Sequence, residues 1–473
     1  MREEEEPMRS KPAMIIAALF IAEMTVTFEA SMVYAALPRL IREFGDPVRV
    51  GWLVTIHLLI AAASAPVIGR LGDIKGRRRL VLLLLALALV GSVISAISTH
   101  LGLVLLGRAL QGLSAVVLPL SIGIVRESLP AEKVPMGIGV LTTALGAGSA
   151  LGLVLGGWIV DNFDWHALFW ASAAMLGVSF AAVAAFVPDR SGTPTKRPID
   201  WVEGLLPVPA IALLLFAVGL SKEAGWLAPR VLAMFAACFV LFGLWARRSL
   251  KAEEPFVDLR LFRERDFAVA NLITVLLGMG TMQVVYIFSA YMQSPPWTAV
   301  GLGLSATLAG LAKLPSNFLS FFAGPFAGWL MQRAGNRTAV AAGALLAASG
   351  WCAALLLPDR LGLVIGLLCL ISFGTTMLQA AIPNIVVASV PQHRTSEAIG
   401  SMQVVRGIAA AIGAQVIAML LASRTVAAPD GGAQFPAPSS YMLTMSAMAT
   451  LTLIGAACAV LLHGKKKPEL AAG

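Results

Sequence analysis

Two carboxyl groups stand inside a stretch that otherwise resembles a membrane-spanning helix. The stretch is AEMTVTFEASMVYAALP, residues 22–38, and the acids are Glu23 and Glu29. On a helix their six-residue separation places them about 120° apart, so they share a broad face at best. A carboxyl group in low-dielectric surroundings keeps its proton at higher pH than in water and can release it when water or a cation arrives. Either glutamate could therefore carry a coupling proton, and structural pairing with a buried basic residue is the alternative.

Three basic residues, Arg108, Lys313 and Arg406, also fall inside apolar stretches. Arg108 and Gln111 lie three residues apart in GRALQG, on one face of a helix. A buried arginine costs about 2.5–3.5 kcal/mol, so we expect Arg108 to face protein or a wet cavity and to take part in proton coupling. Simple structural pairing is again the alternative. Lys313 could contact an anionic group in a cavity or extend to the membrane surface.

The elements that must position these groups are membrane-spanning helices. The chain has 473 residues, of which 58% are hydrophobic and 13% charged, whereas soluble domains carry about 25% charged residues. Apolar stretches of about 20 residues, each long enough to cross a bilayer as a helix, recur along the whole chain. We therefore predict an all-α membrane protein with fourteen spans: 13–36, 48–69, 80–98, 102–125, 135–159, 166–187, 203–220, 229–246, 268–292, 301–330, 338–357, 361–388, 399–422 and 441–463.

The distribution of lysine and arginine predicts which side of the membrane holds the termini. With both termini in the cytoplasm, 25 of the 35 basic residues fall in inside segments, 7 in outside loops and 3 within spans. This asymmetry favours cytoplasmic termini and, for a bacterial protein, the inner membrane. It also explains the net charge of +9 by proximity to the cytoplasm and lipid headgroups, so we expect no nucleic-acid partner.

The two halves of the chain repeat each other at a separation of 259–261 residues. LGLVLLGRALQG from Leu101 parallels LGLVIGLLCLIS from Leu361, and Leu368 stands near the counterpart of Arg108, so the fold does not require that arginine. Further equivalent pairs are Pro66 and Pro325, Gly69 and Gly328, Gly76 and Gly335, Arg78 and Arg337, Gly146 and Gly407, and Gly152 and Gly413. We predict an N-terminal six-helix bundle (1–187), a linker with two inserted spans (188–267) and a C-terminal six-helix bundle (268–473). Parallel halves around a central cavity are typical of alternating-access transporters.

Soft, aromatic and polar side chains within the spans are candidates to line a substrate cavity. They are Met24, Met32, Tyr34, His57, Gln111, Tyr286 and Lys313. Ordinary core packing is the alternative for the methionines and for His57. The five histidines are scattered and no glycine-rich nucleotide-binding loop is present. We therefore expect a monomeric transporter rather than an enzyme, with no metal and no cofactor, that draws on a proton gradient instead of ATP.

The loop GRLGDIKGRRR, residues 69–79, resembles a signature of the major facilitator superfamily, Gly-x-x-x-Asp-(Arg/Lys)-x-Gly-(Arg/Lys)-(Arg/Lys). The matching residues are Gly69, Asp73, Gly76, Arg77 and Arg78, while Ile74 replaces the usual basic residue. Glycines let two helices approach closely, and an aspartate can accept helix-terminal amides or pair with a basic residue when a gate closes. The resemblance implies a cytoplasmic gate here, and a loop that only fixes topology is the alternative.

The first span resembles that of the fourteen-span drug:proton antiporters of this superfamily. Its FEASMVYAALP is similar to their Leu-Asp-x-Thr-x-Val-Asn-x-Ala-Leu-Pro, and Glu29 stands at the aspartate. Arg108 is similarly placed to an arginine of the family's fourth-span motif. The fifth span, GAGSALGLVLGG, shares the glycines of the antiporter motif but has Leu153 where that motif has proline. These glycines, which could equally serve close helix packing, are Gly148, Gly152, Gly156 and Gly157.

The resemblance implies a major facilitator fold of two six-helix bundles with two inserted helices. It also implies proton-coupled efflux of lipophilic, cationic drugs or toxic compounds by alternating access. Arg406, in VVRGIAAAIG, is similar to an arginine of the fourteen-span branch, where a structural role is implied. A dedicated carrier of a lipid or an anionic metabolite is the alternative function, because Lys313 and the missing proline at Leu153 leave room for it.

Overall fold

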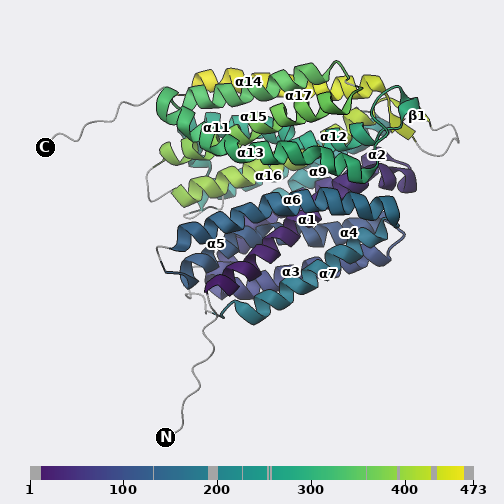
Figure 1. Cartoon of the computed structure of the whole chain (residues 1–473). Coiled ribbons are helices and arrows are strands. Elements are labelled where there is room, and N and C mark those ends of the chain that lie inside the picture. The colour runs from purple at the N-terminus through teal and green to yellow at the C-terminus, as the bar shows by residue number, and fades with distance from the viewer. Residues whose placement is uncertain are drawn as a thin grey trace, which may run out of the picture.

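The computed structural model describes residues 12–130, 133–189, 201–225, 227–252, 255, 258–357, 359–390, 395–427 and 434–462. Helices dominate these ranges, and their one sheet is the antiparallel hairpin of β1 (Thr425–Ala427) and β2 (Gln434–Pro436). Two helical bundles lie against each other, one formed by the first part of the chain and one by the last (Figure 1). The predicted all-α class is therefore confirmed.

The first bundle holds the helices that carry both glutamates and Arg108. Its helices are α1 (Pro12–Phe44), α2 (Pro47–Lys75), α3 (Arg77–Ile97), α4 (Leu101–Gly112), α5 (Val117–Ser128), α6 (Val134–Asn162) and α7 (His166–Phe186). The predicted span 102–125 is not one regular α-helix, because a 3-10 turn, Leu113–Val116, joins α4 to α5. This turn contains Ser114, which lies beside the buried polar groups described below.

The second bundle follows two helices that pack as a pair. The pair is α9 (Pro207–Ala224), preceded by the short α8 (Trp201–Leu205), and α10 (Pro229–Lys251). The bundle consists of α11 (Arg265–Met279), α12 (Val284–Gln293), α13 (Ala306–Ala334), α14 (Asn336–Ala354), α15 (Leu361–Ala388), α16 (Thr395–Leu421) and α17 (Pro438–Cys458). Short 3-10 turns lie at Leu259–Arg263, Thr281–Gln283, Pro296–Thr298 and Ala459–Leu461. The predicted span 268–292 is broken at Gly280, where α11 ends.

Eleven helical segments in the described part of the chain are long and apolar enough to cross a membrane. The other three predicted spans, 203–220, 301–330 and 338–357, coincide with α9, α13 and α14. In α13 the polar residues Lys313, Ser316 and Asn317 reduce the mean hydropathy of the helix. The chain is thus a multi-pass membrane protein, and the count of fourteen spans stays a prediction.

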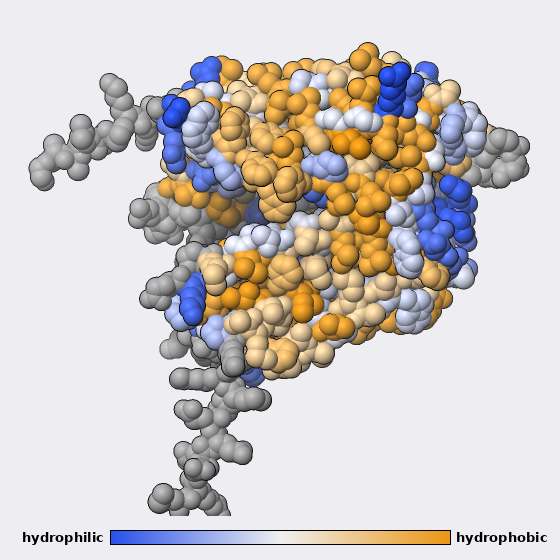
Figure 2. Space-filling model, in the orientation of Figure 1, coloured by the Kyte–Doolittle hydropathy of each residue, from blue (hydrophilic) through white to orange (hydrophobic). Residues whose placement is uncertain are grey.

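The two bundles touch at the end remote from the termini and separate toward the other end. A Cβ atom at Gly157 of α6 would lie 2.5 Å from the Ala306 backbone of α13, and one at Gly407 of α16 would lie 2.4 Å from Ala62 of α2. Nearer the termini, Gly139 of α6 and Gly400 of α16 have no such neighbour within 4 Å. A recess opens between the bundles on the side of the termini (Figure 2). The structure is therefore closed at one end and open at the other.

Candidate functional site

The carboxylate of Glu29 lies in a cage of serine hydroxyl groups inside the first bundle. Its side chain is 0% exposed. Ser92 of α3 and Ser172 of α7 donate to Oε1 at 3.1 and 2.8 Å. Ser114 of the 3-10 turn lies 3.3 Å from Oε2 and shares its one hydroxyl proton with the Gln111 carbonyl oxygen at 2.7 Å. A hydroxyl group can donate to a carboxylate or accept from a carboxylic acid, so this cage can hold either protonation state. Sequence reasoning missed the serines, whose only signal is a small polar residue in an apolar helix.

Arg108 joins this cluster through main-chain and amide oxygens. Its Nε donates to the Leu53 carbonyl at 3.1 Å, and one terminal nitrogen donates to the Glu29 carbonyl at 3.1 Å and to Gln111 Oε1 at 2.8 Å. Gln111 Nε2 in turn donates to Ser92 Oγ at 2.6 Å. The guanidinium therefore bonds to the main chain of Glu29 rather than to its carboxylate. It ties α1, α2 and α4 together, and the hydrogen-bonded chain through Gln111 and Ser92 connects it to the carboxylate.

Glu23 is placed apart from this cluster. It is 1% exposed and accepts a hydrogen bond from Ser121 of α5 at 3.2 Å. Six residues of helix separate it from Glu29 by about 9 Å along α1, toward the end of the bundle that holds the termini. The two predicted proton carriers thus have separate surroundings, and only Glu29 lies in the network of Arg108.

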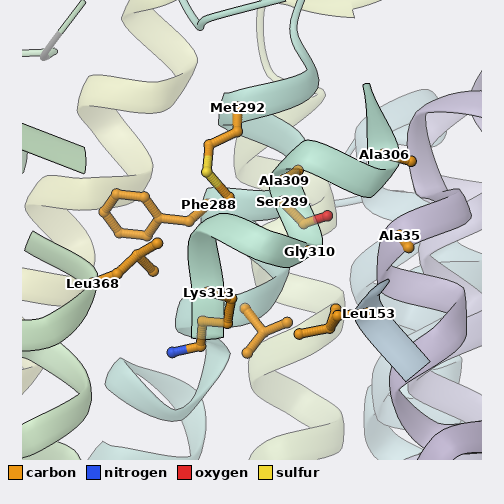
Figure 3. Close-up of a pocket in the computed structure, with 11 residues that line it drawn as sticks. Ala35, Leu153, Phe288, Ser289, Met292, Ala306, Ala309, Gly310, Lys313 and Leu368 are labelled. Atoms are coloured by element: carbon orange, nitrogen blue, oxygen red, sulfur yellow. The ribbon is translucent and has the colours of Figure 1, made fainter. Parts of the chain in front are cut away.

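A small pocket between the two bundles contains Lys313 (Figure 3). Its lining comes from five helices, and the residues are Ala35, Leu153, Val285, Phe288, Ser289, Met292, Ala306, Ala309, Gly310, Lys313 and Leu368. Lys313 is 6% exposed, and its Nζ donates to Ser372 Oγ of α15 at 2.5 Å. No carboxylate lines the pocket. Ser372 was also missed by sequence reasoning.

The remaining predicted cavity residues do not gather around this pocket. The rings of Tyr34 and Tyr286 pack across the two bundles with centroids 6.0 Å apart. Met32 is 0% exposed and packs against Gly156, inside the first bundle. His57 is also buried, and its Nδ1 has no hydrogen-bond partner among the described residues. Met24 is half-buried on α1, where its carbonyl oxygen faces Gly148.

The basic loop after α2 forms contacts within the first bundle. Gly76 adopts a positive φ of 94°, which permits the sharp turn between α2 and α3. Arg77 forms an ion pair with Glu127, and Arg78 donates to the Ala184 carbonyl at 2.7 Å. Gly69 lies on the last turns of α2. The side chain of Asp73 lies outside the described residues, so its predicted gating role stays a prediction.

Glycines of α6 permit two close helix contacts. Gly148, Gly152 and Gly156 face α1, and a Cβ atom at the first two would lie 2.3 and 2.8 Å from the carbonyl oxygens of Met24 and Phe28. Gly157 instead faces α13 of the other bundle. The same row of glycines thus packs α6 onto α1 on one side and onto the second bundle on the other.

Asp161, at the end of α6, binds the first turn of α13 across the closed end. Its Oδ1 accepts from the Ala306 amide at 3.0 Å, and its Oδ2 accepts from the Thr307 amide at 2.8 Å and the Thr307 hydroxyl at 2.5 Å. An aspartate at a helix N-terminus accepts hydrogen bonds from free main-chain amides, and its negative charge interacts favourably with the positive end of the helix dipole. Sequence reasoning missed this contact, because Asp161 looks like an ordinary acid at the end of a span.

Comparison with known proteins identifies the relatives of this chain. A family model described as Major Facilitator Superfamily matches residues 19–414. The multidrug efflux pump LfrA of Mycolicibacterium smegmatis is 26% identical over 412 residues, which cover 86% of this chain and 80% of that protein. The multidrug transporter protein MdtP of Bacillus subtilis is 23% identical over 355 residues, or 74% of this chain, but the match spans less than two thirds of MdtP, 64%.

Solved structures resemble the whole chain in fold. The POT family transporter PepTSo superposes with a TM-score of 0.66 at 13% sequence identity, over 96% of this chain and 98% of that one. At this identity the likeness shows the fold alone. It agrees with the predicted arrangement of two six-helix bundles.

Proposed function

The chain belongs to the major facilitator superfamily and is a transporter rather than an enzyme, and from this premise we propose that it exports lipophilic compounds in exchange for protons. Relatives named as a multidrug efflux pump and a multidrug transporter support export of such compounds. We place it in the bacterial inner membrane as a monomer, with both termini in the cytoplasm. The proton gradient supplies the energy, and no cofactor is required.

The observation that carries the proposal is the serine cage around Glu29. Burying a carboxyl group within the membrane costs free energy, so such a group is a functional candidate, and Glu29 is fully buried among three serine hydroxyl groups. Its carboxylate does not form an ion pair with Arg108, which bonds to main-chain oxygens instead. Protonation of Glu29 therefore breaks no direct ion pair and leaves the hydrogen bonds of Arg108 to main-chain oxygens in place.

Alternating access supplies the movement of substrate across the membrane. The closed end, sealed by Gly157 and Asp161 against α13, faces outward in the proposed orientation, so the recess faces the cytoplasm. In this inward-facing state a substrate enters from the cytoplasm or the inner leaflet. Opening the outer end then requires the bonds of Asp161 to break.

The charge of the substrate is the point on which two candidate functions differ. The resemblance to drug:proton antiporters favours lipophilic cations. The pocket between the bundles contains Lys313 and no carboxylate, which favours a substrate with an anionic group. A carrier of an anionic amphiphile is therefore the second candidate function.

Transport by inside-out vesicles with an acidic interior tests the proposal. Uptake of a lipophilic cation and of a lipophilic anion would each be compared between wild type, Glu29→Gln and Glu43→Gln, at matched amounts of protein in the membrane. Glu43 is an exposed glutamate of the same helix, so its substitution is the control. We expect gradient-driven uptake of one of the two probes, and we expect it to be lost only in Glu29→Gln. Unchanged uptake in Glu29→Gln would refute its role, and absence of uptake of both probes by wild type would refute proton-driven export of lipophilic compounds.

A further inference from the structure

We propose that Lys313, together with Ser372, binds an acidic group of the transported substrate, so that the ligand is a lipophilic anion. This inference rests on the proposed function only in assuming that the chain binds an amphiphile between its bundles. It concerns the charge of the ligand and is independent of proton coupling.

The surroundings of Lys313 lack the negative charge that a buried ammonium group needs. Among the described residues its only hydrogen-bond partner is the uncharged hydroxyl of Ser372. A buried cation without a counter-charge is costly, and intramembrane lysines normally pair with an acid or mark a substrate path. An acidic ligand group arriving in the pocket would supply the missing charge and form a charge-assisted hydrogen bond.

The fold itself does not require this lysine. The repeat of the chain at 259 residues pairs α13 with α2, so the counterpart of Lys313 is Val54. Val54 is buried and apolar, and it occupies the equivalent place in the first bundle without any charge. Helix packing therefore explains the position but not the ammonium group.

The pocket also has the amphipathic character that such a ligand needs. The first bundle contributes only the apolar side chains of Ala35 and Leu153, and α12 contributes Phe288 and Met292. In Figure 3 the amine of Lys313 is directed to the side of Leu368, one helical turn from Ser372, and away from Ala35. An acidic group would therefore bind toward α15, with the apolar part of the ligand against the first bundle.

A second cation faces the space between the bundles. Three sides of α16 pack against other helices. One side contacts α2 through Gly407 and Ala418, and a second contacts α11 through Ala409 and Gly413. The third packs beside α9 through Ile408 and Ile412. At about 100° per residue, Arg406 is turned away from the side of α9 and lies between the sides of α2 and α11. It is half-buried and has no hydrogen-bond or ion-pair partner within the described ranges. Its counterpart at 261 residues is Leu145, so this charge too is no requirement of the fold.

The acids of the first bundle do not offset these cations. Glu23 and Glu29 are both buried inside that bundle, 1% and 0% exposed, and bonded to its own serines. A cationic ligand between the bundles would meet Lys313 and Arg406, whereas an anionic ligand would meet no described carboxylate in the pocket. The electrostatics therefore favour the anion.

Binding to the full chain in lipid nanodiscs, with no gradient, tests the inference. The probes are radiolabelled decanoate and decyltrimethylammonium, which share a ten-carbon chain and carry opposite charges. The variants are Lys313→Met, Lys313→Arg and, as control, Lys251→Met, which changes an exposed lysine at the end of α10. Empty nanodiscs give the lipid background.

We expect decanoate to bind wild type, Lys313→Arg and the control, and to bind Lys313→Met at least about tenfold more weakly, as the loss of a charged hydrogen bond predicts. Decyltrimethylammonium should not lose affinity in Lys313→Met. Should Lys313→Met fold poorly by gel filtration, Ser372→Ala replaces it, with a loss of a few fold expected. Equal decanoate binding by wild type and Lys313→Met (or Ser372→Ala, where it replaces Lys313→Met), or preference of wild type for the cation, would overturn the inference. Because no gradient is present, failure of proton coupling in vesicles would leave this result untouched.

Discussion

Replacing Asp161 by asparagine should shift the protein toward a state in which the end remote from the termini is open. The carboxylate accepts three hydrogen bonds from the first turn of α13, two of them from main-chain amides. Asparagine keeps one acceptor oxygen, loses the charge that favours the helix N-terminus, and turns an NH2 group toward a donor. The contact joins the two bundles, so it stabilises only the state that is closed at this end.

The magnitude follows from the number and exposure of these bonds. A hydrogen bond to a charged group contributes about 1.5–3 kcal/mol when buried. Asp161 is exposed, so solvent reduces the loss to about 1–2 kcal/mol for the whole contact. A change of this size alters the ratio of the two states about five- to thirty-fold.

Electron–electron distance measurements between two spin labels would detect this shift. Labels at Phe163→Cys and Leu356→Cys sit at the closed end, one on each bundle, and both native side chains are exposed. The free cysteines to be replaced by alanine beforehand are Cys238, Cys352, Cys369 and Cys458. We expect Asp161→Asn to increase the population at longer distance. Asp164→Asn is the matched control, since Asp164 bonds to His166 in the same bundle. A distribution identical to that of wild type would refute the idea that Asp161 stabilises the closed end.

Two further substitutions test the contacts around the site. Gly157→Ala should raise the population of the state that is open at this end about tenfold, because the new Cβ atom would lie 2.5 Å from the Ala306 backbone. The rate of alkylation of a cysteine placed at the closed end would measure this change. Gly139→Ala is the control and should change nothing, because no atom lies within 4 Å of the Cβ position there. Arg108→Gln should lower the free energy of unfolding by about 1–3 kcal/mol, because buried carbonyl oxygens of Leu53 and Glu29 lose their donor. Thermal denaturation in detergent measures the loss, and a melting temperature equal to that of Arg230→Gln, an exposed position, would contradict it.

Sequence reasoning predicted apolar helices long enough to cross a membrane and singled out the unusual acids, because hydropathy and motif spacing are properties of the chain itself. The count of fourteen spans and the repeat stay predictions. Sequence reasoning could not give the partners of Glu29, because Ser92, Ser114 and Ser172 come from different helices and carry no periodic signal. It also placed Met32 in a cavity, although a methionine inside a span is equally suited to the core in which the structure buries it.

Sequence reasoning did not predict the breaks in the helices either. Gly280 and the turn at Leu113–Val116 interrupt spans whose hydropathy is continuous. Only the packing of neighbouring helices fixes where such turns fall, and the sequence does not state that packing directly. The same limit applies to Asp161, whose partner lies 145 residues later in the chain.

The proposed proton carrier and the proposed ligand site lie in different bundles, and this separation bears on how proton and substrate transport are coupled. Glu29 is enclosed in the first bundle, while Lys313 belongs to the second, so a proton and a substrate do not compete for one group. Coupling must then pass through a change in conformation that both sites bias. A contiguous set of contacts exists for this: α1 carries Glu29, α6 packs on α1 through its glycines, and the end of α6 holds α13.

A conformational link through α1 and α6 predicts an effect that competition of proton and substrate for one group does not predict. Glu29→Gln imitates the protonated carboxyl group, so it should shift the distance distribution between the labels at residues 163 and 356 in the absence of any substrate. Lys313→Met should leave the substrate-free distribution unchanged, because its proposed role requires a ligand. If Glu29→Gln alters the distribution only when a substrate is added, competition at a shared site explains the coupling better than a conformational link through α1 and α6.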